Sequence, residues 1–333
     1  MIHSSSPLVS ILLPTHNRSD TLRLAIASLL AQTVEDFELF VVGDGCTDDT
    51  PDVVQSFDDN RITWLDLPKA PGFGYGNRNE ATARARGRFM AYLGHDDIAL
   101  PDHLERLLNC FENPDVHFAY SRPLWILPKG EIVPGTSNLH EPSARRLFLE
   151  QRINTIPAGN AMYRDESTPK KFHWNPKLTQ QGDWDLWIRI LNESPGTPET
   201  ALAYLPVPTC LHFTADWRTL ENAGPPENAD WLKLHEQKSL LPPELHLPVP
   251  ENELEQESFW DAITQDDPAA WTANLRLAVA KAIDVYATFG GQDQRPLYER
   301  LEKAEHRADR LRGELDRKKE RIAKLESRLE DQK

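Results

Sequence analysis

Two adjacent carboxylates follow an apolar run, and their position at the end of that run suggests metal or phosphate chemistry. The strand-like segment at 89–93 leads directly into Gly94-His95-Asp96-Asp97. Ligands of open α/β sheets bind at the carboxyl ends of strands, and paired carboxylates there suit a hard divalent cation that also holds phosphates. From these residues alone the alternative is a solvated turn, in which Asp96 or Asp97 caps the next helix.

Other polar groups occupy similar positions, at the ends of predicted strands or the starts of predicted helices. They are Pro-Thr-His-Asn-Arg at 14–18, Gly-Asp-Gly at 43–45, Gly-Asn-Arg at 76–78 and Gly-Asp-Trp-Asp-Leu-Trp at 182–187. The carboxyl ends of parallel strands meet at one edge of a sheet, so the groups that follow strands are expected to converge there.

The elements that must position these groups alternate between strands and helices. Strands are predicted at 8–13, 38–42, 61–65, 89–93, 117–121 and 201–207 from short β-type apolar runs, and helices at about 20–30, 48–57, 77–86, 102–111 and 183–191 from apolar spacing. Such alternation predicts an α/β fold with a mostly parallel sheet and covered faces. Residues 122–170 are predicted to be loops over the sheet face, and residues 267–288 a helix.

In their order and spacing, the polar groups resemble those of the family 2 glycosyltransferases, inverting enzymes of the GT-A nucleotide-diphosphosugar fold. The resemblance covers roughly residues 7–215. It implies a GT-A catalytic domain at 1–215. The sequence after it is interpreted from its own pattern as a helical appendage at 216–292 and a C-terminal coiled coil at 293–333. Two positions depart from the family pattern: Gly94 replaces the first metal-motif aspartate, and Gly182 replaces the glutamate that usually precedes the base.

The resemblance also implies a role for each matching residue. Asp183 would be the general base, and Asp96 and His212 would hold a Mn²⁺ or Mg²⁺ ion that bridges the diphosphate. The residues expected to bind the nucleotide sugar are Pro14, Thr15, Asn17, Arg18, Asp44, Arg78, His95 and Asp97. Those expected, more weakly, at the acceptor are Trp184, Asp185 and Trp187.

The same residues have structural alternatives. Asp44 could brace a glycine-flanked turn, and Arg78 could pair with an acidic neighbour. Asp183 could cap its helix, with Trp184 facing the core. An isolated histidine such as His212 could be an ordinary half-buried side chain.

The predicted reaction is a single displacement in which Asp183 takes the proton of an acceptor hydroxyl. The donor would be a UDP-sugar and the acceptor a glycan or lipid-linked hydroxyl, in surface polysaccharide synthesis. A catalytically silent GT-A scaffold or assembly protein is an alternative, motivated by Gly94, Gly182 and the long tail. A sugar nucleotidyltransferase is another, but it would need a basic glycine-rich loop near the first strand, and residues 14–18 do not form one.

Composition restricts the partners. The 333 residues carry a net charge of -15, and residues 1–294 alone carry -18, which would repel nucleic acid. The three cysteines form neither a disulfide framework nor a zinc pattern. No apolar run approaches the length of a membrane span. These features predict a cytoplasmic protein, attached to the inner face of a membrane only through partners.

The tail carries an unbroken heptad pattern. Its apolar positions alternate spacings of four and three, with Lys318 as the polar exception; they are Leu297, Leu301, Ala304, Ala308, Leu311, Leu315, Lys318, Ile322, Leu325 and Leu329. This pattern predicts a coiled coil. A long solvated single helix is the alternative.

We predict that residues 295–333 self-associate as a parallel dimer or trimer, because leucine at both core positions does not select firmly between two and three strands. Light scattering on the full chain and on a 1–290 truncation measures this. A monomeric full chain would refute self-association, and a folded but inactive truncation would refute the separation of the tail from catalysis.

Overall fold

A computed structural model describes residues 6–165, 172–214, 228–237, 240–265 and 267–289. The predicted coiled coil at 295–333 lies outside these ranges.

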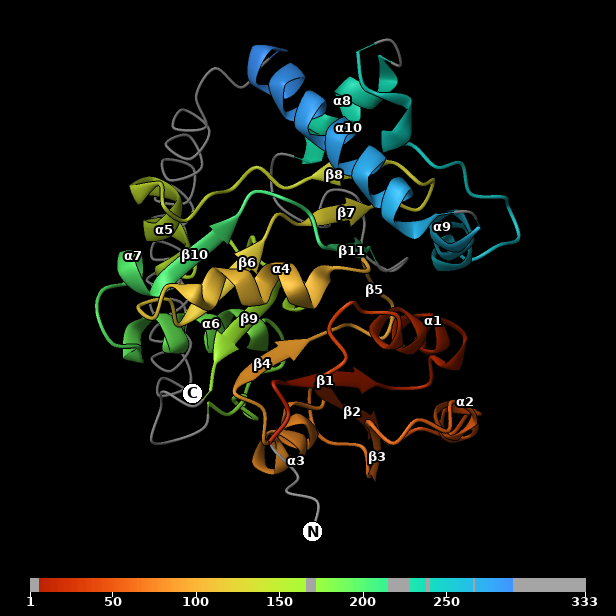
Figure 1. Ribbon diagram of the computed structural model, residues 1–333, viewed down its shortest axis with the longest axis vertical. Coiled ribbons are helices and arrows are strands. Elements are labelled where there is room, and N and C mark those ends of the chain that lie inside the picture. Colours follow the sequence, from red (N-terminus) through yellow and green to blue (C-terminus); the bar gives the residue numbers. More distant parts are fainter. Residues whose placement is uncertain (1–5, 166–171, 215–227, 238–239, 266, 290–333) are drawn as a thin grey trace, which may run out of the picture.

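A seven-stranded sheet forms the centre of the molecule, in the order β10-β6-β9-β4-β1-β2-β3 (Figure 1). Its strands are β1 (Val9–Thr15), β2 (Phe37–Asp44), β3 (Ile62–Leu67), β4 (Phe89–Tyr92), β6 (Phe118–Ser121), β9 (Ala161–Arg164) and β10 (Leu202–Leu205). Strand β9 is antiparallel to β4 and β6, and every other pair is parallel. The predicted α/β fold with a mostly parallel sheet is confirmed.

Helices cover both faces of this sheet because side chains alternate along each strand. In β1, Ile11 and Leu13 join one apolar core while Leu12 joins the other. The first core is completed by α1 (Ser19–Leu30), α2 (Thr50–Ser56) and α4 (His103–Asn109), with η1 (Cys110–Glu112) following α4. The second core is completed by α3 (Tyr75–Arg84), α5 (Pro142–Leu149) and α6 (Gly182–Glu193). The short helix α7 (Pro198–Ala201) precedes β10.

A second sheet, in the order β5-β11-β7-β8, lies beside the first. Its strands are β5 (Ile98–Ala99), β7 (Leu124–Ile126), β8 (Ile132–Pro134) and β11 (Cys210–Phe213). A third core joins this sheet to α8 (Asn228–Glu236), η3 (Pro243–Leu245), α9 (Glu255–Thr264) and α10 (Pro268–Phe289). Figure 1 shows α10 as the long blue helix next to this sheet. The described helices after residue 216 therefore share a core with strands from the predicted catalytic domain.

The prediction of loops over residues 122–170 was wrong. This stretch contains β7, β8, α5, η2 (Ala158–Asn160) and β9, and β9 inserts into the main sheet between β4 and β6. Strands β7 and β8 have three residues each and β9 has four. Runs this short do not reveal a period of two, so tertiary pairing rather than local pattern determines them.

The appendage helices also bond to the segments that follow β4 and β5. Gln256 in α9 donates from Nε2 to the backbone oxygen of Asp96 at 3.3 Å. Arg276 in α10 donates to both carboxylate oxygens of Asp102, at 2.7 and 2.5 Å. Burial would raise the pKa of Asp102, but the bonds from Arg276 and Arg106 outweigh it and hold that pKa below its usual value. None of the helices in the described ranges has the length and apolar character to cross a membrane.

Substitution of two leucines on α10 tests whether this helix packs in the third core. Leu275 is 2% exposed in the third core, whereas Leu277 on the same helix is 56% exposed. Leu275→Ala is expected to reduce the free energy of unfolding by about 2–5 kcal/mol through the cavity that it leaves. Leu277→Ala should change it by no more than about 0.5 kcal/mol. Urea unfolding of both variants measures the difference, and equal effects would contradict the packing of α10 on the second sheet.

Candidate functional site

The predicted site residues gather at the carboxyl ends of β1, β2 and β4. After β1, the chain adds β2 and β3 on one side of β1 and then returns to add β4 on the other side. The direction in which strands are added therefore reverses between β1 and β4. Such a reversal opens a crevice in which open α/β sheets bind ligands. Contacts join the loops here: His95 Nδ1 lies 3.3 Å from the backbone oxygen of Pro14, and the Asn17 side chain accepts from the Thr47 backbone N–H at 2.7 Å.

Asp44 ends β2 and holds the loop that leads to α3. Its Oδ1 accepts from the Ala70 backbone N–H at 2.7 Å and from Asn77 at 2.8 Å, and its Oδ2 is paired with Lys69. A side chain at Gly74 would meet this carboxylate at 2.7 Å. Asp44 therefore braces the loop, as the structural alternative proposed. A carboxylate has about four acceptor positions, so these three bonds leave one for a ligand.

Arg78 presents a cation at the same edge. Its guanidinium carbon lies 4.8 Å from the ring centre of Tyr75 and 4.5 Å from that of Trp174, and it donates to the Phe73 oxygen at 3.2 Å. Within the described residues it forms no ion pair, and its buried Nε has no hydrogen-bond partner. Burial lowers the pKa of Arg78, but a guanidinium stays protonated in proteins. A partly exposed cation without a carboxylate partner among the described residues can bind a phosphate.

Asp183 lies in the first turn of α6. The cap residue of this helix is Gln181, in a left-handed conformation with φ 57°, so Asp183 is not the N-cap. Its Oδ1 accepts from the Trp184 backbone N–H at 2.9 Å. Burial raises the pKa of Asp183, and the nearby charges of Arg78 and His212 oppose that rise. A carboxylate with a raised pKa beside a ligand crevice is suited to proton transfer.

Asp97, directly before β5, is buried and pairs with the partly buried His212 on the neighbouring strand β11. His212 Nδ1 lies 2.9 and 3.1 Å from the carboxylate oxygens of Asp97, and the Phe213 backbone N–H donates to the same carboxylate at 3.2 Å. With Asp97 as acceptor, the ring carries its proton on Nδ1, which leaves Nε2 as the acceptor nitrogen. A carboxylate behind a histidine in this way orients that ring toward a metal.

Asp96 is the other predicted metal ligand. Within the described ranges its carboxylate makes no hydrogen bond or ion pair. A side chain at Gly94 would lie 2.8 Å from oxygens of both Asp96 and Asp97, so the turn leaves no space for another carboxylate there. The described residues contain no group of three or more metal-ligating side chains. By its chemistry, the carboxylate of Asp96 suits a cation that takes its other ligands from phosphates and water, as Mg²⁺ commonly does, and a neutral imidazole such as that of His212 is also a common metal ligand.

The last residue of β1 contributes a further polar group without a hydrogen-bond partner among the described residues. Thr15 is buried, and its Oγ1 has no hydrogen-bond partner among the residues described. Arg18 instead lies 3.5 Å from Asp20 at the exposed start of α1. Of these two predicted residues, Thr15 is the one whose polar atom remains available at the strand edge.

The three residues predicted at the acceptor follow Asp183 in α6. Trp184 and Trp187 are buried, and their ring N–H groups donate to the backbone oxygens of Phe148 and Ile156. Asp185 accepts two bonds from Arg189, at 3.0 and 2.8 Å. The contacts of the two tryptophans match the structural alternative of core packing, while Asp185 is paired with Arg189.

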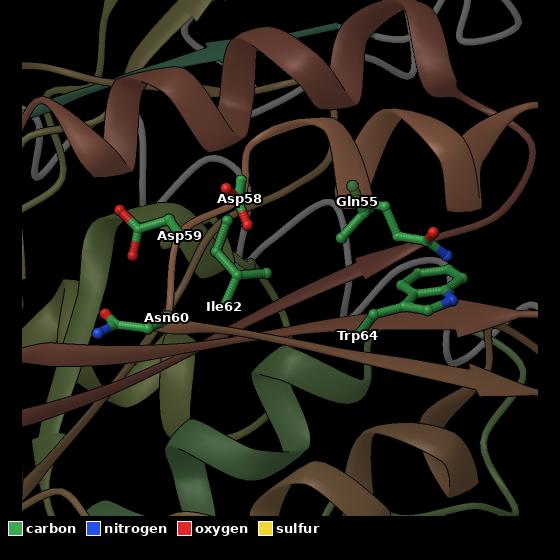
Figure 2. A pocket seen from close by; sticks show the side chains of 7 residues that line it. Gln55, Asp58, Asp59, Asn60, Ile62 and Trp64 are labelled. Carbon is green, nitrogen blue, oxygen red and sulfur yellow. The ribbon is translucent and has the colours of Figure 1, made fainter.

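Two polar hollows in the described surface lie away from this edge. One, of about 260 Å³, is formed by α2, β3 and the turn between them (Figure 2). The other, of about 290 Å³, lies between α1 and α9, where Arg23 and Glu257 are paired. Neither contains a residue of the strand-edge site.

Comparison with known sequences decides the family. The pattern of glycosyl transferase family 2 matches residues 10–170. The chain is also 38% identical over 187 residues to an Escherichia coli enzyme named UDP-Glc:alpha-D-GlcNAc-diphosphoundecaprenol beta-1,3-glucosyltransferase WfgD, covering 56% of this chain and 71% of that protein. The chain belongs to glycosyl transferase family 2. The resemblance found in the sequence is thereby confirmed.

Two further comparisons place this family 2 chain among its relatives. An uncharacterised glycosyltransferase of Methanocaldococcus jannaschii is 29% identical over 194 residues, which is 56% of this chain and 65% of that protein. The solved structure of Staphylococcus aureus TarS 1-349 in complex with UDP-GlcNAc has a TM-score of 0.50 and 19% identity, covering 84% of this chain and 89% of that one. The second comparison shows a common fold.

Sequence reasoning missed two contributors to the site in this family 2 chain. Tyr75 lies one helical turn before Arg78, and Lys69 pairs with Asp44 from the loop before α3. The spacing of three residues within a helix would have placed Tyr75 on the same face as Arg78. No sequence signal distinguishes Lys69 from an ordinary surface lysine.

Arg78→Gln is expected to weaken UDP binding by about 10-fold or more, because charge-assisted hydrogen bonds contribute roughly 1.5–3 kcal/mol. The matched control is Arg84→Gln on the same helix, whose side chain is half exposed and 4.0 Å from Glu80. Titration calorimetry with UDP measures both affinities. If the two variants lose affinity equally, Arg78 has no special role in binding the anion.

Proposed function

We propose that this protein is an inverting glycosyltransferase that moves a sugar from a UDP-sugar to a hydroxyl of a glycan or lipid-linked acceptor in surface polysaccharide synthesis. The reaction would take place on the cytoplasmic side of a membrane, with attachment through partners. The observation that carries the proposal is the combination of Asp183, Arg78 and the Asp97–His212 pair at one strand edge.

Each of these groups has a chemical task. Asp183 would accept the proton of the acceptor hydroxyl, and its raised pKa makes it a better base than an exposed aspartate. Arg78 would offset the negative charge of the diphosphate as it leaves. Because the base and the diphosphate site come from different elements, the acceptor oxygen could approach the anomeric carbon opposite the leaving group. Inversion of configuration would follow.

Asp96 and His212 would hold Mn²⁺ or Mg²⁺, which supplies further charge stabilisation to the diphosphate when bound. Asp97 would keep His212 in the orientation and tautomer that a metal ligand needs. Thr15 and Asp44 would contact the nucleoside from the ends of β1 and β2, with the remaining acceptor position of Asp44 facing an imide N–H of uracil.

The named relatives support the choice of substrates. WfgD is named for transfer of glucose from UDP-Glc to a diphosphoundecaprenol-linked sugar. A Bacillus subtilis relative that is 33% identical over 189 residues is named as a putative teichuronic acid biosynthesis glycosyltransferase. The fold relative TarS has been solved with UDP-GlcNAc. All three names are consistent with a nucleotide-sugar donor and a cell-surface glycan.

Asp183→Asn tests the proposed base. The amide keeps the shape but cannot take a proton at neutral pH, so kcat should fall by about 10²–10⁴ while UDP binding persists. Asp185→Asn is the matched comparison in the same helical turn, and it should retain most of the rate because its carboxylate is paired with Arg189. Transfer from a panel of UDP-sugars with manganese measures both variants. An Asp183→Asn enzyme as fast as the parent would place the base elsewhere, with Asp185 the next candidate.

The pH dependence follows from the raised pKa of Asp183. The base works only when ionised, so the rate should fall as pH falls through that pKa. The midpoint of this acid limb should lie above the ordinary aspartate value of about 3.9. A pH profile of kcat/KM measures it, and a midpoint at or below the ordinary value would show that the surroundings of Asp183 do not raise its pKa.

A further inference from the structure

The start of helix α6 is fitted around the side chain of Tyr75. The Gly182 backbone N–H donates to the Tyr75 hydroxyl at 3.0 Å. A Cβ atom at position 182 would lie 2.5, 2.6 and 2.8 Å from three carbons at the tip of the Tyr75 ring. Such distances are too short for real contacts, so the ring takes the space that any side chain at 182 would need.

The ring of Tyr75 cannot easily move aside. The side chain is 5% exposed, and its ring is stacked on Trp174 with centres 5.4 Å apart and planes 9° from parallel. The guanidinium of Arg78 lies over both rings. Because buried side chains are closely packed, a group added at Gly182 would displace the helix rather than the stack.

The Tyr75 hydroxyl also replaces a helix cap. The first backbone N–H groups of a helix have no partner within the helix, and the cap residue Gln181 makes no side-chain cap bond. The hydroxyl satisfies the N–H of Gly182, the residue directly before Asp183. Since Tyr75 and Arg78 both belong to α3, the phenol links the helix of the proposed base to the cation.

We infer that Tyr75 is a positioning residue for the proposed base: its hydroxyl and ring tip, acting on Gly182, set the place of Asp183 relative to Arg78. The two residues then depend on each other: with the Tyr75 ring in this place, position 182 has room only for glycine. This inference rests on the proposed role of Asp183.

Tyr75→Phe removes the hydroxyl and keeps the ring. Because a displaced reacting group can cost on the order of 100-fold in rate, we expect kcat to fall by about 10-fold to 100-fold, with unchanged UDP affinity and KM for the sugar donor. Tyr163→Phe is the matched control, since it removes another buried hydroxyl, one that lies 3.4 Å from Tyr92. This control should keep the kcat of the parent.

A second pair of variants tests the coupling. Gly182→Ala should lower kcat because its methyl group meets the ring tip. Tyr75→Leu has no atoms at the ring tip, so the double variant Tyr75→Leu, Gly182→Ala should be faster than Gly182→Ala alone, a non-additive result. Additive losses would overturn the coupling.

The assay uses UDP-glucose, UDP-galactose and UDP-N-acetylglucosamine with manganese and a GlcNAc-diphosphate-lipid acceptor, on the full chain. A parent enzyme without transfer would overturn the proposed function. An active parent whose Tyr75→Phe variant keeps the same kcat would overturn the positioning role alone. Thermal unfolding of each variant identifies losses that come from misfolding, and a Tyr75→Phe protein that loses kcat only in proportion to its folded fraction would also overturn the inference.

Discussion

The buried carboxylate of Asp97 is the constraint on which the site depends. It is 3% exposed, and a carboxylate so deep in the protein is costly unless hydrogen bonds satisfy it. Its partners are the His212 ring and the Phe213 backbone N–H, both on β11 of the second sheet. Asp97 itself ends the loop that runs from β4 of the main sheet to β5 of the second sheet. Its bonds therefore hold the end of that loop against β11 and orient His212, one of the two residues proposed to bind metal; the other, Asp96, is its neighbour in the loop.

Helix α9 packs against both β11 and the loop that holds Asp96 and Asp97. Phe259 of α9 packs edge-on against Phe213 with ring centres 5.5 Å apart, and Gln256 of the same helix bonds to the backbone of Asp96. Within the described ranges, helix α9 thus contributes to the site through the shape of the loop after β4, without supplying a proposed ligand. A family 2 fold with the second sheet left bare would expose the third core to water.

Aromatic packing holds Arg78 and the start of α6 in place. Tyr75, Trp174 and Arg78 form a stack from two segments far apart in the chain, and α6 begins on top of it. This arrangement accounts for one departure from the family pattern, since Gly182 faces the phenol. The other departure, Gly94, lies beneath the Asp96 and Asp97 carboxylates. At both positions, neighbouring side chains occupy the space that a larger residue than glycine would need.

The first half of the fold could be predicted from the sequence because its strands are long and buried and its helices are amphipathic. Strand β1, predicted at 8–13, spans Val9–Thr15, and β2, predicted at 38–42, spans Phe37–Asp44. Strand β9 could not be predicted, because four residues carry no reliable period and its place in the sheet is set by partners distant in sequence.

For the site too, the sequence predicted individual residues but not the contacts between residues that are far apart in the chain. The family resemblance identified Asp97 and His212, but their mutual contact joins residues 115 positions apart and has no local signal. It also placed Trp184 and Trp187 at the acceptor, whereas the structure packs both in the core. Apolar spacing in a helix reports burial but does not report which buried face borders a ligand.

A crystal structure with an intact UDP-sugar and manganese tests the central claim most directly. We expect the diphosphate to lie between Arg78 on one side and Asp96 and His212 on the other, with the anomeric carbon facing Asp183 and the nucleoside against Thr15 and Asp44. A nucleotide bound in the hollow between α2 and β3, or a diphosphate that contacts neither Arg78 nor Asp96, would contradict it.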